Sequence, residues 1–332
     1  MKKINKKTRV FYITLFLSII VLIIAVLLQK VEFFEQKKGF NYLSSKGVNY
    51  FGPYNDIHTE QKSDYRTIEK EVKGAKDVLY IRNTSNRNPA VKTDLSHLYD
   101  LLKYVKEPII LVTADGDRAV PSSYDKDLVN KLLSSPKIKR WLTQNYDRTL
   151  EHYKLGYYPI GLNVHTTKFY PNNVKTPDEK WQYYLKIRMK NSKNKKKNIF
   201  CDSHLSITNK RRKEMHDILK DNKLIDFLPK RISGGEIMEK YSSYRYVLSP
   251  VGNGLDCHRT WETILLGSVP VLESSSLDDM FLNNNLPVMV VDDYSKLNNM
   301  SQSDLDNWWK ANEDKMSDKN ILEKFEVEYW LK

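Results

Sequence analysis

Apolar and polar residues alternate along the chain in two successive blocks, and each block predicts strands and helices in turn. In the first block, apolar runs at 77–81 and 108–113 predict buried strands, and the apolar spacing over 95–104 predicts an amphipathic helix. Further short elements are expected at 138–145 and 157–162. Continuous apolar strands separated by helices are typical of a parallel sheet covered by helices.

The second block restarts this alternation after residue 190. Strands are expected at 198–205, 245–250, 269–272 and 287–291, and helices at 209–219, 237–244 and 256–266, before a helical tail at 304–332. The predicted fold class is therefore α/β, with two Rossmann-like lobes that face a cleft. Ligands of such sheets bind beyond the carboxyl ends of the strands, where the strand-to-helix loops lie.

One apolar segment does not fit either block. Residues 10–28 run for 19 positions without a charge, which is enough for a helix to cross a hydrocarbon core of roughly 30 Å. Five basic residues and no acid precede it, so residues 1–9 are expected to be a cytosolic tail and 10–28 an uncleaved signal anchor. A cleaved signal peptide is the alternative, but 27–30 offers no small-residue cleavage site. Residues 29–75 are then a stem on the far side of the membrane.

Composition and charge exclude several classes of protein. The chain has 332 residues, a net charge of +13 and only two cysteines, Cys201 and Cys257, which excludes a disulfide-dense mini-fold and a four-thiolate zinc site. Much of the charge lies in 186–213, with eleven Lys and Arg against Asp202 alone. This run lacks interleaved stacking aromatics, so we expect a solvated linker and no nucleic-acid partner. Attraction to an anionic acceptor or lipid surface is the alternative. The run divides a first lobe, 76–190, from a second, 191–332.

The loop at 249–262 carries the densest candidate chemistry. Gly252 and Gly254 allow backbone amides to approach a ligand, and the helix that follows presents free N–H groups to an anion. Arg259 and Glu262 lie three residues apart on one helix face, and they suit a diphosphate and a ribose respectively. This pattern predicts a sugar-nucleotide site. A simple glycine turn and an internal ion pair between Arg259 and Glu262 are the alternatives.

Candidates for a catalytic base lie in the first lobe. Asp115 and Asp117 follow the strand at 108–113, and His165 follows the apolar run at 157–162. The two aspartates have the D-x-D form that can hold a divalent ion, but we favour acceptor contact or proton abstraction. The histidines show no clustered metal-ligand spacing, so no metal is expected. Two N-x-S/T sequons, at Asn83 and Asn299, are compatible with a lumenal face.

At this loop the chain resembles the exostosin-like glycosyltransferases, most closely the ribitol xylosyltransferase-like branch. The resemblance is carried by residues 246–262, 266–271, 286–288 and 290–293, and weakly by 207–212, 141–145 and 159–162. It implies a GT-B fold, a single-pass type II protein of the Golgi or ER with a lumenal catalytic part, a UDP-sugar donor, an inverting transfer to a glycan or glycoprotein, and no obligatory metal. Transferred position by position, it puts donor contacts on Ser249, Gly252, Asn253, Gly254, Arg259 and Glu262, with Thr208, Asn209 and Arg212 on a facing loop.

The expected mechanism is direct displacement at the anomeric carbon, with Arg259 and the helix start stabilising the leaving diphosphate and Asp115, Asp117 or His165 as the base. Two alternatives come from other classes. One is a catalytically inactive, membrane-tethered sugar-binding protein of the same fold. The other is an anchored nucleic-acid or polyanion binder that uses 186–213.

Overall fold

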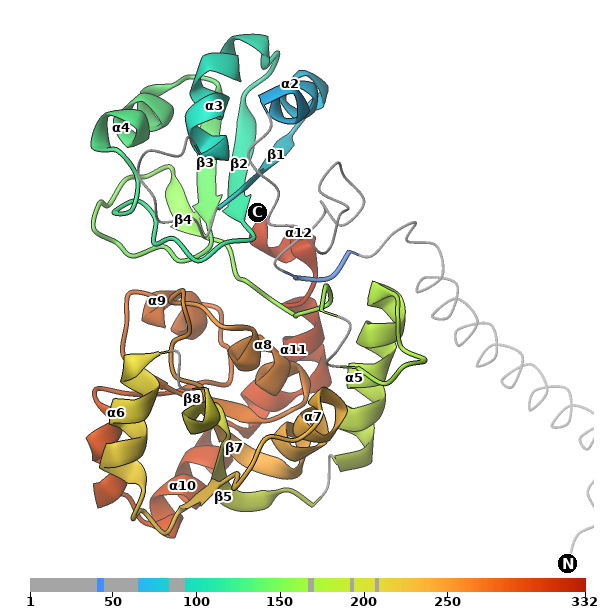
Figure 1. The fold of residues 1–332 in the computed structure, drawn as a ribbon, viewed down its shortest axis with the longest axis vertical. Coiled ribbons are helices and arrows are strands. Elements are labelled where there is room, and N and C mark those ends of the chain that lie inside the picture. The colour runs from blue at the N-terminus through green and yellow to red at the C-terminus, as the bar shows by residue number, and fades with distance from the viewer. Residues whose placement is uncertain (1–40, 45–64, 84–92, 167–169, 192–193, 207–208) are drawn as a thin grey trace, which may run out of the picture. The chain divides into compact units, whose positions relative to one another are not determined.

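The computed structural model describes residues 41–44, 65–83, 93–166, 170–191, 194–206 and 209–332 (Figure 1). The predicted tail 1–9, the predicted anchor 10–28 and most of the predicted stem lie outside these residues. None of the helices in the described part combines the length and the apolar character that crossing a membrane requires. The chain divides after Asn41, and the elements below belong to the unit Tyr42–Lys332.

The first sheet is parallel, in the order β1-β2-β3-β4. Its strands are β1 (Val78–Arg82), β2 (Ile109–Ala114), β3 (Ile138–Thr143) and β4 (Leu155–Tyr157), and its helices are α2 (Tyr65–Gly74), α3 (Asp94–Leu101) with the 3₁₀ turn η2 (Leu102–Tyr104), and α4 (Lys126–Ser134). Thr93 and Asp125 cap α3 and α4 by accepting hydrogen bonds from backbone N–H groups of the first turn. These helices therefore begin where the sequence provides a side-chain acceptor.

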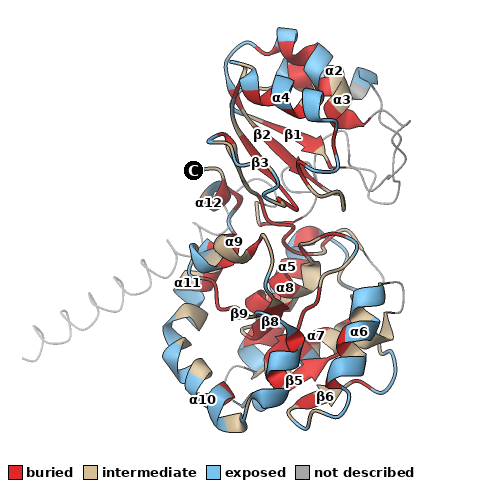
Figure 2. Cartoon of the chain, turned by 90° about the vertical axis from the view of Figure 1, so that its left-hand side faces the viewer, coloured by how far each residue is buried: buried red, intermediate tan, exposed pale blue. Residues whose placement is uncertain are grey.

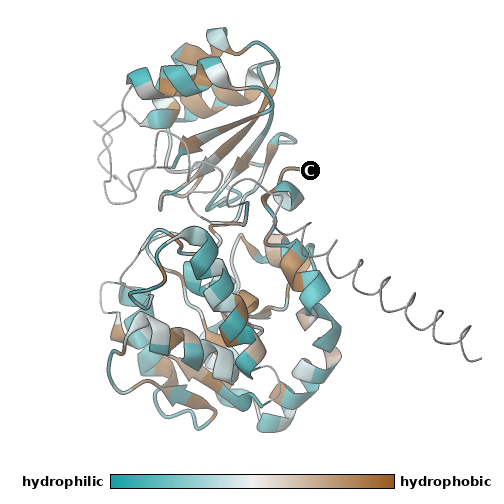
Figure 3. Ribbon diagram, turned by 90° about the vertical axis from the view of Figure 1, so that its right-hand side faces the viewer, coloured by the Kyte–Doolittle hydropathy of each residue, from teal (hydrophilic) through white to brown (hydrophobic). Residues whose placement is uncertain are grey.

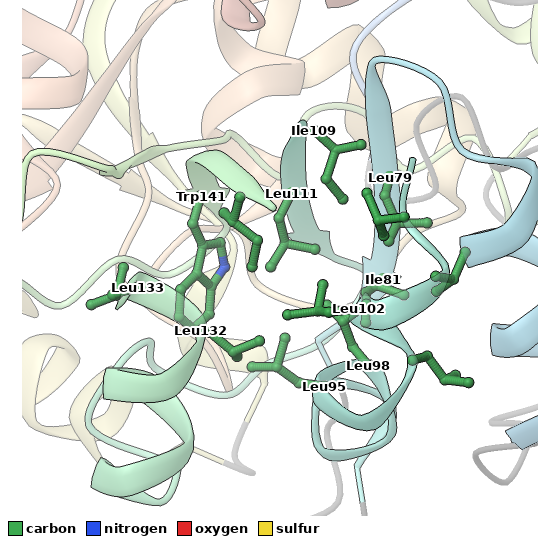
Figure 4. Packing of buried hydrophobic residues seen from close by; sticks show 14 of the residues in the cluster. Leu79, Ile81, Leu95, Leu98, Leu102, Ile109, Leu111, Leu132, Leu133 and Trp141 are labelled. Atoms are coloured by element: carbon green, nitrogen blue, oxygen red, sulfur yellow. The ribbon is translucent and has the colours of Figure 1, made fainter. Parts of the chain in front are cut away.

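One face of this sheet forms a hydrophobic core with all three helices. Alternate residues of β1 and β2, such as Ile81 and Leu111, meet a stripe of leucines on α3 that includes Leu95 and Leu98, with Trp141 of β3 beside α4 (Figure 4). These five side chains are at most 1 % exposed. The period of two on the strands and of three to four on the helices thus makes a single core.

The second sheet is also parallel, in the order β6-β5-β7-β8-β9. Its strands are β5 (Lys196–Cys201), β6 (Ile225–Phe227), β7 (Tyr244–Leu248), β8 (Val269–Glu273) and β9 (Met289–Val291). The chain runs from β5 outward to β6 and then returns to β7 on the other side of β5. The loops that follow β5 and β7 therefore meet at the point where strand order reverses, which is where such sheets bind ligands.

Helices cover both faces of the second sheet, whose central strands β7 and β8 are almost entirely buried (Figure 2). On one face, α6 (Lys210–Leu219), the 3₁₀ helix η5 (Tyr294–Asn299) and α10 (Gln302–Ala311) contribute to the core, and on the other α7 (Gly234–Ser243) and α8 (His258–Leu265) contact the strands. Hydrophobic residues concentrate on the strands, while the outer helices are mainly hydrophilic (Figure 3). The remaining elements are α5 (Pro177–Asn191), α9 (Asp278–Leu282), α11 (Asp318–Glu323), α12 (Val327–Trp330) and the short 3₁₀ turns η4 (Ser203–Leu205) and η6 (Glu313–Met316).

The α/β class with parallel sheets is confirmed, and the elements expected in both blocks are present with ends shifted by at most five residues. One difference concerns 138–145, which forms the strand β3 rather than an unspecified element. Another is the expected strand 198–205, whose last three residues form η4.

The stem prediction is wrong for its described residues. α2 packs on β1 and α3 because Ile68 and Val72, one helical turn apart, are both fully buried. Leu43 is fully buried as well: its N–H donates to the Phe325 carbonyl, and its own carbonyl accepts from the N–H of Leu162. Residues 42–44 and 65–74 are therefore part of the folded body.

The linker prediction for 186–213 is also wrong where the structure describes the run. This run continues α5, forms β5 and begins α6. Lys195 is half-buried, and its ammonium donates to the carbonyls of Ser242 and Leu266 and to the Ser268 hydroxyl. Most of α5 falls within residues 76–190, which were expected to form the first lobe. The helix nevertheless contacts α7 and α8 beside the second sheet (Figure 1). Lys195 of this run therefore serves the fold, and the domain boundaries remain a prediction.

Candidate functional site

The glycine loop, residues 249–257 between β7 and α8, is tightly held at both ends. The Ser249 N–H donates to the Val271 carbonyl on β8, and the Ser249 hydroxyl lies 2.9 Å from that of Thr260 on α8. Within the loop, the Gly252 N–H donates to the Gly254 carbonyl at 3.1 Å. A Cβ on Gly254 would come within 2.8 Å of the Asn145 amide, so only glycine fits there. The loop is built to bring backbone close to another segment.

A cleft of about 790 Å³ opens beside this loop. Residues 251–255 line one side and Asn209, Lys210 and Arg211 of the α6 start line another, with residues 117–119 of the loop after β2 opposite. Asn209 caps α6 through Arg211 N–H (2.9 Å) and also donates to the Gly252 carbonyl (2.5 Å). This residue therefore joins the helix start to the glycine loop.

The charge of this cleft favours an anion. Arg118, Lys210 and Arg211 line it, against Asp117 as the lining carboxylate. The start of α6 adds the positive end of the helix dipole, while the N–H groups of Arg211 and Arg212 are already paired with Asn209. A phosphate or diphosphate group satisfies both the guanidinium donors and the helix start.

A second pocket of about 430 Å³ adjoins the first and shares Arg211, Val251 and Leu255 with it. It lies at the carboxyl ends of β7 and β8, and its polar lining is mainly hydroxyl and carboxylate. Those groups come from Glu214, Ser249, Asp256, Thr260, Glu273, Ser274, Ser275, Asp293 and Tyr294. Such a lining suits a neutral polyhydroxylated group beside the anion.

Arg259 lies at the strand-order reversal, where it is bound by residues of two other elements. Its Nε donates to Asp202 Oδ1 at 3.1 Å and to the Tyr241 hydroxyl at 2.9 Å, and its Nη2 lies 3.4 Å from Asp202 Oδ2. The side chains of Arg259 and Asp202 are 14 % and 16 % exposed. Among the described residues, Arg259 Nη1 has no hydrogen-bond partner and Arg259 does not line either pocket. That Arg259 contacts a diphosphate, through its Nη1 group, remains a prediction.

Arg212 brings a second guanidinium to the same region. Its Nε donates to the Val251 carbonyl at 3.2 Å, and its Nη2 packs against Gly252, 3.4 Å from where a Cβ would lie. Burial and the neighbouring Arg259 lower the pKa of Arg212. The charge of Arg259 thus disfavours that of Arg212, and the carboxylate of Asp202 partly offsets this effect.

Glu262 does not pair directly with Arg259. Its Oε1 accepts a hydrogen bond from the Tyr184 hydroxyl at 2.9 Å, and Tyr184 in turn lies 3.0 Å from the Tyr170 hydroxyl. Burial raises the pKa of Glu262 to about 7, despite the Tyr184 hydrogen bond and the charge of Arg259. The ion pair that Arg259 forms is with Asp202, not with Glu262 as the alternative in the sequence analysis had it. Carboxyl groups with a shifted pKa, such as that of Glu262, are frequent at functional sites.

The three candidate bases are placed differently. Asp117 lines the cleft. His165 lies beside His258, with ring centroids 5.6 Å apart, and Asp117 acts electrostatically on His258. Asp115 has a φ of 60°, and its N–H donates to the Gln144 side chain, which ties its loop to the end of β3. Asp117 is therefore the candidate base that faces the cleft.

Of the remaining predicted site residues, Asn253 is exposed in the cleft and Thr208 lies outside the described residues. Sequence reasoning missed Asp202, Tyr241 and Asn145, which hold the predicted residues in place. Asp202 lies inside the strand expected at 198–205 and follows the observed end of β5, so no local signal in the sequence singled it out. Across the described residues, no three metal-ligating side chains gather in one place.

No protein-family model and no curated protein sequence matches the chain. Solved structures similar to it at low scores include the three that follow. An α,α-trehalose 6-phosphate synthase from Burkholderia multivorans matches with a TM-score of 0.41 and 11 % identity, over 80 % of this chain and 73 % of that one. A UDP-forming α,α-trehalose-phosphate synthase from Burkholderia vietnamiensis gives 0.42 and 11 %, over 80 % and 74 %. A glycosyltransferase from Rickettsia africae gives 0.39 and 14 %, over 82 % and 81 %. At these scores no functional conclusion rests on the similarity.

Proposed function

We propose that this chain is a glycosyltransferase that takes a sugar from a nucleoside-diphosphate sugar and transfers it to a glycan or glycoprotein acceptor. The observation that carries the proposal is the basic cleft, in which the α6 start and the glycine loop face Asp117. Its cations and helix start suit a diphosphate, and the adjoining hydroxyl- and carboxylate-lined pocket suits the sugar. The two pockets share Arg211, so both parts of one donor can be held at once.

The chemistry that follows is a single displacement. The acceptor hydroxyl oxygen attacks the anomeric carbon, the bond from that carbon to the diphosphate oxygen breaks, and Asp117 takes the hydroxyl proton. The departing diphosphate gains negative charge, which Lys210, Arg211 and the positive end of the α6 dipole stabilise. This route inverts the anomeric centre and needs no metal. Arg259 and Arg212 add charge on the side where strand order reverses.

The finer parts of the proposal rest on the sequence. We propose a UDP-sugar donor, membership of the exostosin-like group with a GT-B arrangement of its lobes, and a type II anchor at 10–28 that places the body in the lumen of the Golgi or ER. The uncharged run and the basic tail before it support the anchor.

A thermal-shift screen of nucleoside diphosphates and their sugars, followed by a transfer assay, tests the function. A ligand at 100 times its Kd stabilises the folded state by about 2.7 kcal/mol. Lys210→Gln and Arg211→Gln should each raise the Kd about ten-fold or more, because a charged hydrogen bond contributes about 1.5–3 kcal/mol. Lys213→Gln, on the same helix but exposed away from the cleft lining, is the matched control.

The outcomes separate the alternatives. Binding without transfer or donor hydrolysis would favour an inactive sugar-binding protein. Equal binding by the Lys213 and Lys210 variants would refute the placement of the diphosphate. No stabilisation by any nucleotide would refute the function itself.

A further inference from the structure

Asn145 is a buried polar residue in a conformation that few side chains accept. It lies two residues after the end of β3, is 1 % exposed and has a φ of 57°. Asparagine tolerates this left-handed region better than most residues. Its backbone carbonyl accepts from the Val120 N–H at 3.0 Å, so the main chain is fixed in place. The side chain therefore has a defined direction.

That side chain bridges the two loops that form opposite sides of the cleft. Its Nδ2 donates to the Gly116 carbonyl at 3.0 Å, in the loop that carries Asp117. Its Oδ1 accepts from the Asp256 N–H at 2.9 Å, in the glycine loop. The amide also packs on Gly254, where a Cβ would come within 2.8 Å. One amide thus contacts both loops through a donor and an acceptor.

The chemistry of this bridge fits asparagine better than its near relatives. The Gly116 carbonyl needs a donor, and it receives a second one from Gln144 at 2.9 Å. The Asp256 N–H needs an acceptor. Aspartate would offer only acceptors, so its second oxygen would face the Gly116 carbonyl, and two buried acceptors at hydrogen-bond distance repel. Leucine of similar size would leave both backbone groups unpaired.

We propose that Asn145 is a positioning residue that holds the loop of Asp117 in register with the glycine loop, and so sets the separation between the base and the bound donor. This inference rests on the proposed function. Because a displacement of about 1 Å between reacting groups can cost on the order of 10²-fold in rate, a single bridge of this kind can govern transfer without touching the substrate.

The test compares Asn145→Asp and Asn145→Gly with Asn130→Asp, an exposed asparagine on α4. Both Asn145 variants tolerate the positive φ, so the backbone conformation is preserved. With full-length protein well below its unfolding temperature, kcat for transfer should fall about 10²-fold while donor KM changes less than about three-fold. The ratio of donor hydrolysis to transfer should rise, since donor binding survives but acceptor activation does not.

A distance measurement decides the inference independently of activity. Spin labels on Lys126→Cys of α4 and Lys213→Cys of α6, both exposed positions, report the separation of the two sheets' helices. The protein without the introduced cysteines, treated with the same spin label, shows how much signal comes from the native Cys201 and Cys257. The distribution should broaden or shift in both Asn145 variants and stay as in wild type for Asn130→Asp.

An unchanged distribution together with an unchanged kcat would overturn the proposal. Equal changes in kcat and in the folded fraction, with the remaining folded protein fully active, would show a purely structural role and overturn it too. If wild-type protein neither binds nor turns over any nucleotide sugar, the proposed function fails, and the spin-label distances alone decide whether Asn145 registers the loops.

Discussion

The pair formed by Arg259 and Asp202 allows a structural role of the arginine to be separated from a role in donor binding. Arg259→Gln removes the charge that faces Asp202 and leaves that carboxylate with the Tyr241 hydroxyl, 3.1 Å from both oxygens. Breaking a buried ion pair costs about 3–5 kcal/mol. Because both side chains keep about 15 % exposure, we expect about 2–3 kcal/mol here.

The double variant Arg259→Gln/Asp202→Asn measures how much of that loss is the pair itself. Each single variant leaves one charged side chain without its partner. The unfolding free energy of the double variant should therefore be about 2 kcal/mol higher than the sum of the two single losses predicts. Urea unfolding followed by tryptophan fluorescence gives the three free energies. Tyr241→Phe is a useful reference, because it removes a hydroxyl from the network and no charge.

Nucleotide binding then distinguishes the two roles. Wild type with UDP at 100 times its Kd should gain about 2.7 kcal/mol. Asp202→Asn frees the guanidinium from its counter-charge and should keep or increase this gain, whereas Arg259→Gln should lose most of it. If Arg259→Gln unfolds more easily yet retains the full gain, the arginine serves only the fold, and the reasoning that gives Nη1 to a phosphate is refuted.

Three further predictions follow from buried residues. Burial lowers the pKa of His258 to about 4, whereas the same side chain in the unfolded chain takes up a proton near pH 6.5. The unfolding free energy should therefore fall by up to about 3 kcal/mol as pH drops from about 6.5 through 4. His258→Gln should flatten this slope in urea titrations at several pH values. Leu43→Ala should cost about 2–5 kcal/mol in unfolding free energy because Leu43 is fully buried, while Leu282→Ala, at a 51 % exposed position, should cost far less; equal losses would contradict the packing of residues 42–44. In secreted or lumenal protein, peptide mapping should find a glycan on the exposed Asn299 and none on Asn83. Asn83 is fully buried, and its side chain is hydrogen-bonded to the Tyr124 hydroxyl and the Arg118 carbonyl. A glycan on Asn83 in folded protein would contradict the structure, and no glycan on either asparagine would count against the lumenal placement.

The elements that the sequence predicts well are those in which local pattern and burial agree. The strand β2 is a continuous apolar run buried in the sheet, and α8 carries Trp261, Ile264 and Leu265 on its core face, as its spacing requires. The glycine loop is also a local signal, because the glycines and the helix after them are adjacent in the chain. The fold class and the centre of the site therefore follow from short windows of sequence.

The parts that sequence reasoning missed depend on contacts distant in the chain. Helix α2 offers only Ile68 and Val72 as a buried stripe, too few for its pattern to stand out from a polar stem. In the sequence, Lys195 is indistinguishable from the solvated lysines beside it. Its three acceptors come from segments distant in the chain and are known only from the structure. Asp202 acquires its role from Arg259, 57 positions later, and such a pairing leaves no local trace.

Asp256 shows how the two sheets' loops reach a fixed arrangement at a cost in solvation. It directly precedes Cys257, the N-cap residue of α8. Its carboxylate accepts from the Ile160 N–H at 2.7 Å, from the Cys257 N–H at 2.9 Å and from the Trp261 indole. Burial raises its pKa to about 6, partly offset by these donors.

A hydrophobic side chain at this position would avoid that solvation penalty but would leave three buried N–H groups unpaired. The carboxylate is therefore the group that lets the glycine loop, α8 and the segment after β4 converge on one point. Asp256→Asn keeps the shape but turns one acceptor into a donor facing N–H groups, so it should destabilise the protein. Because the raised pKa gives the native carboxyl extra stabilising protonation as pH falls from 7 to 5, and Asn cannot take up that proton, the loss should be larger at pH 5 than at pH 7. A difference that is the same at both pH values, in urea unfolding of the two proteins, would show that Asp256 acts through its shape rather than through its charge.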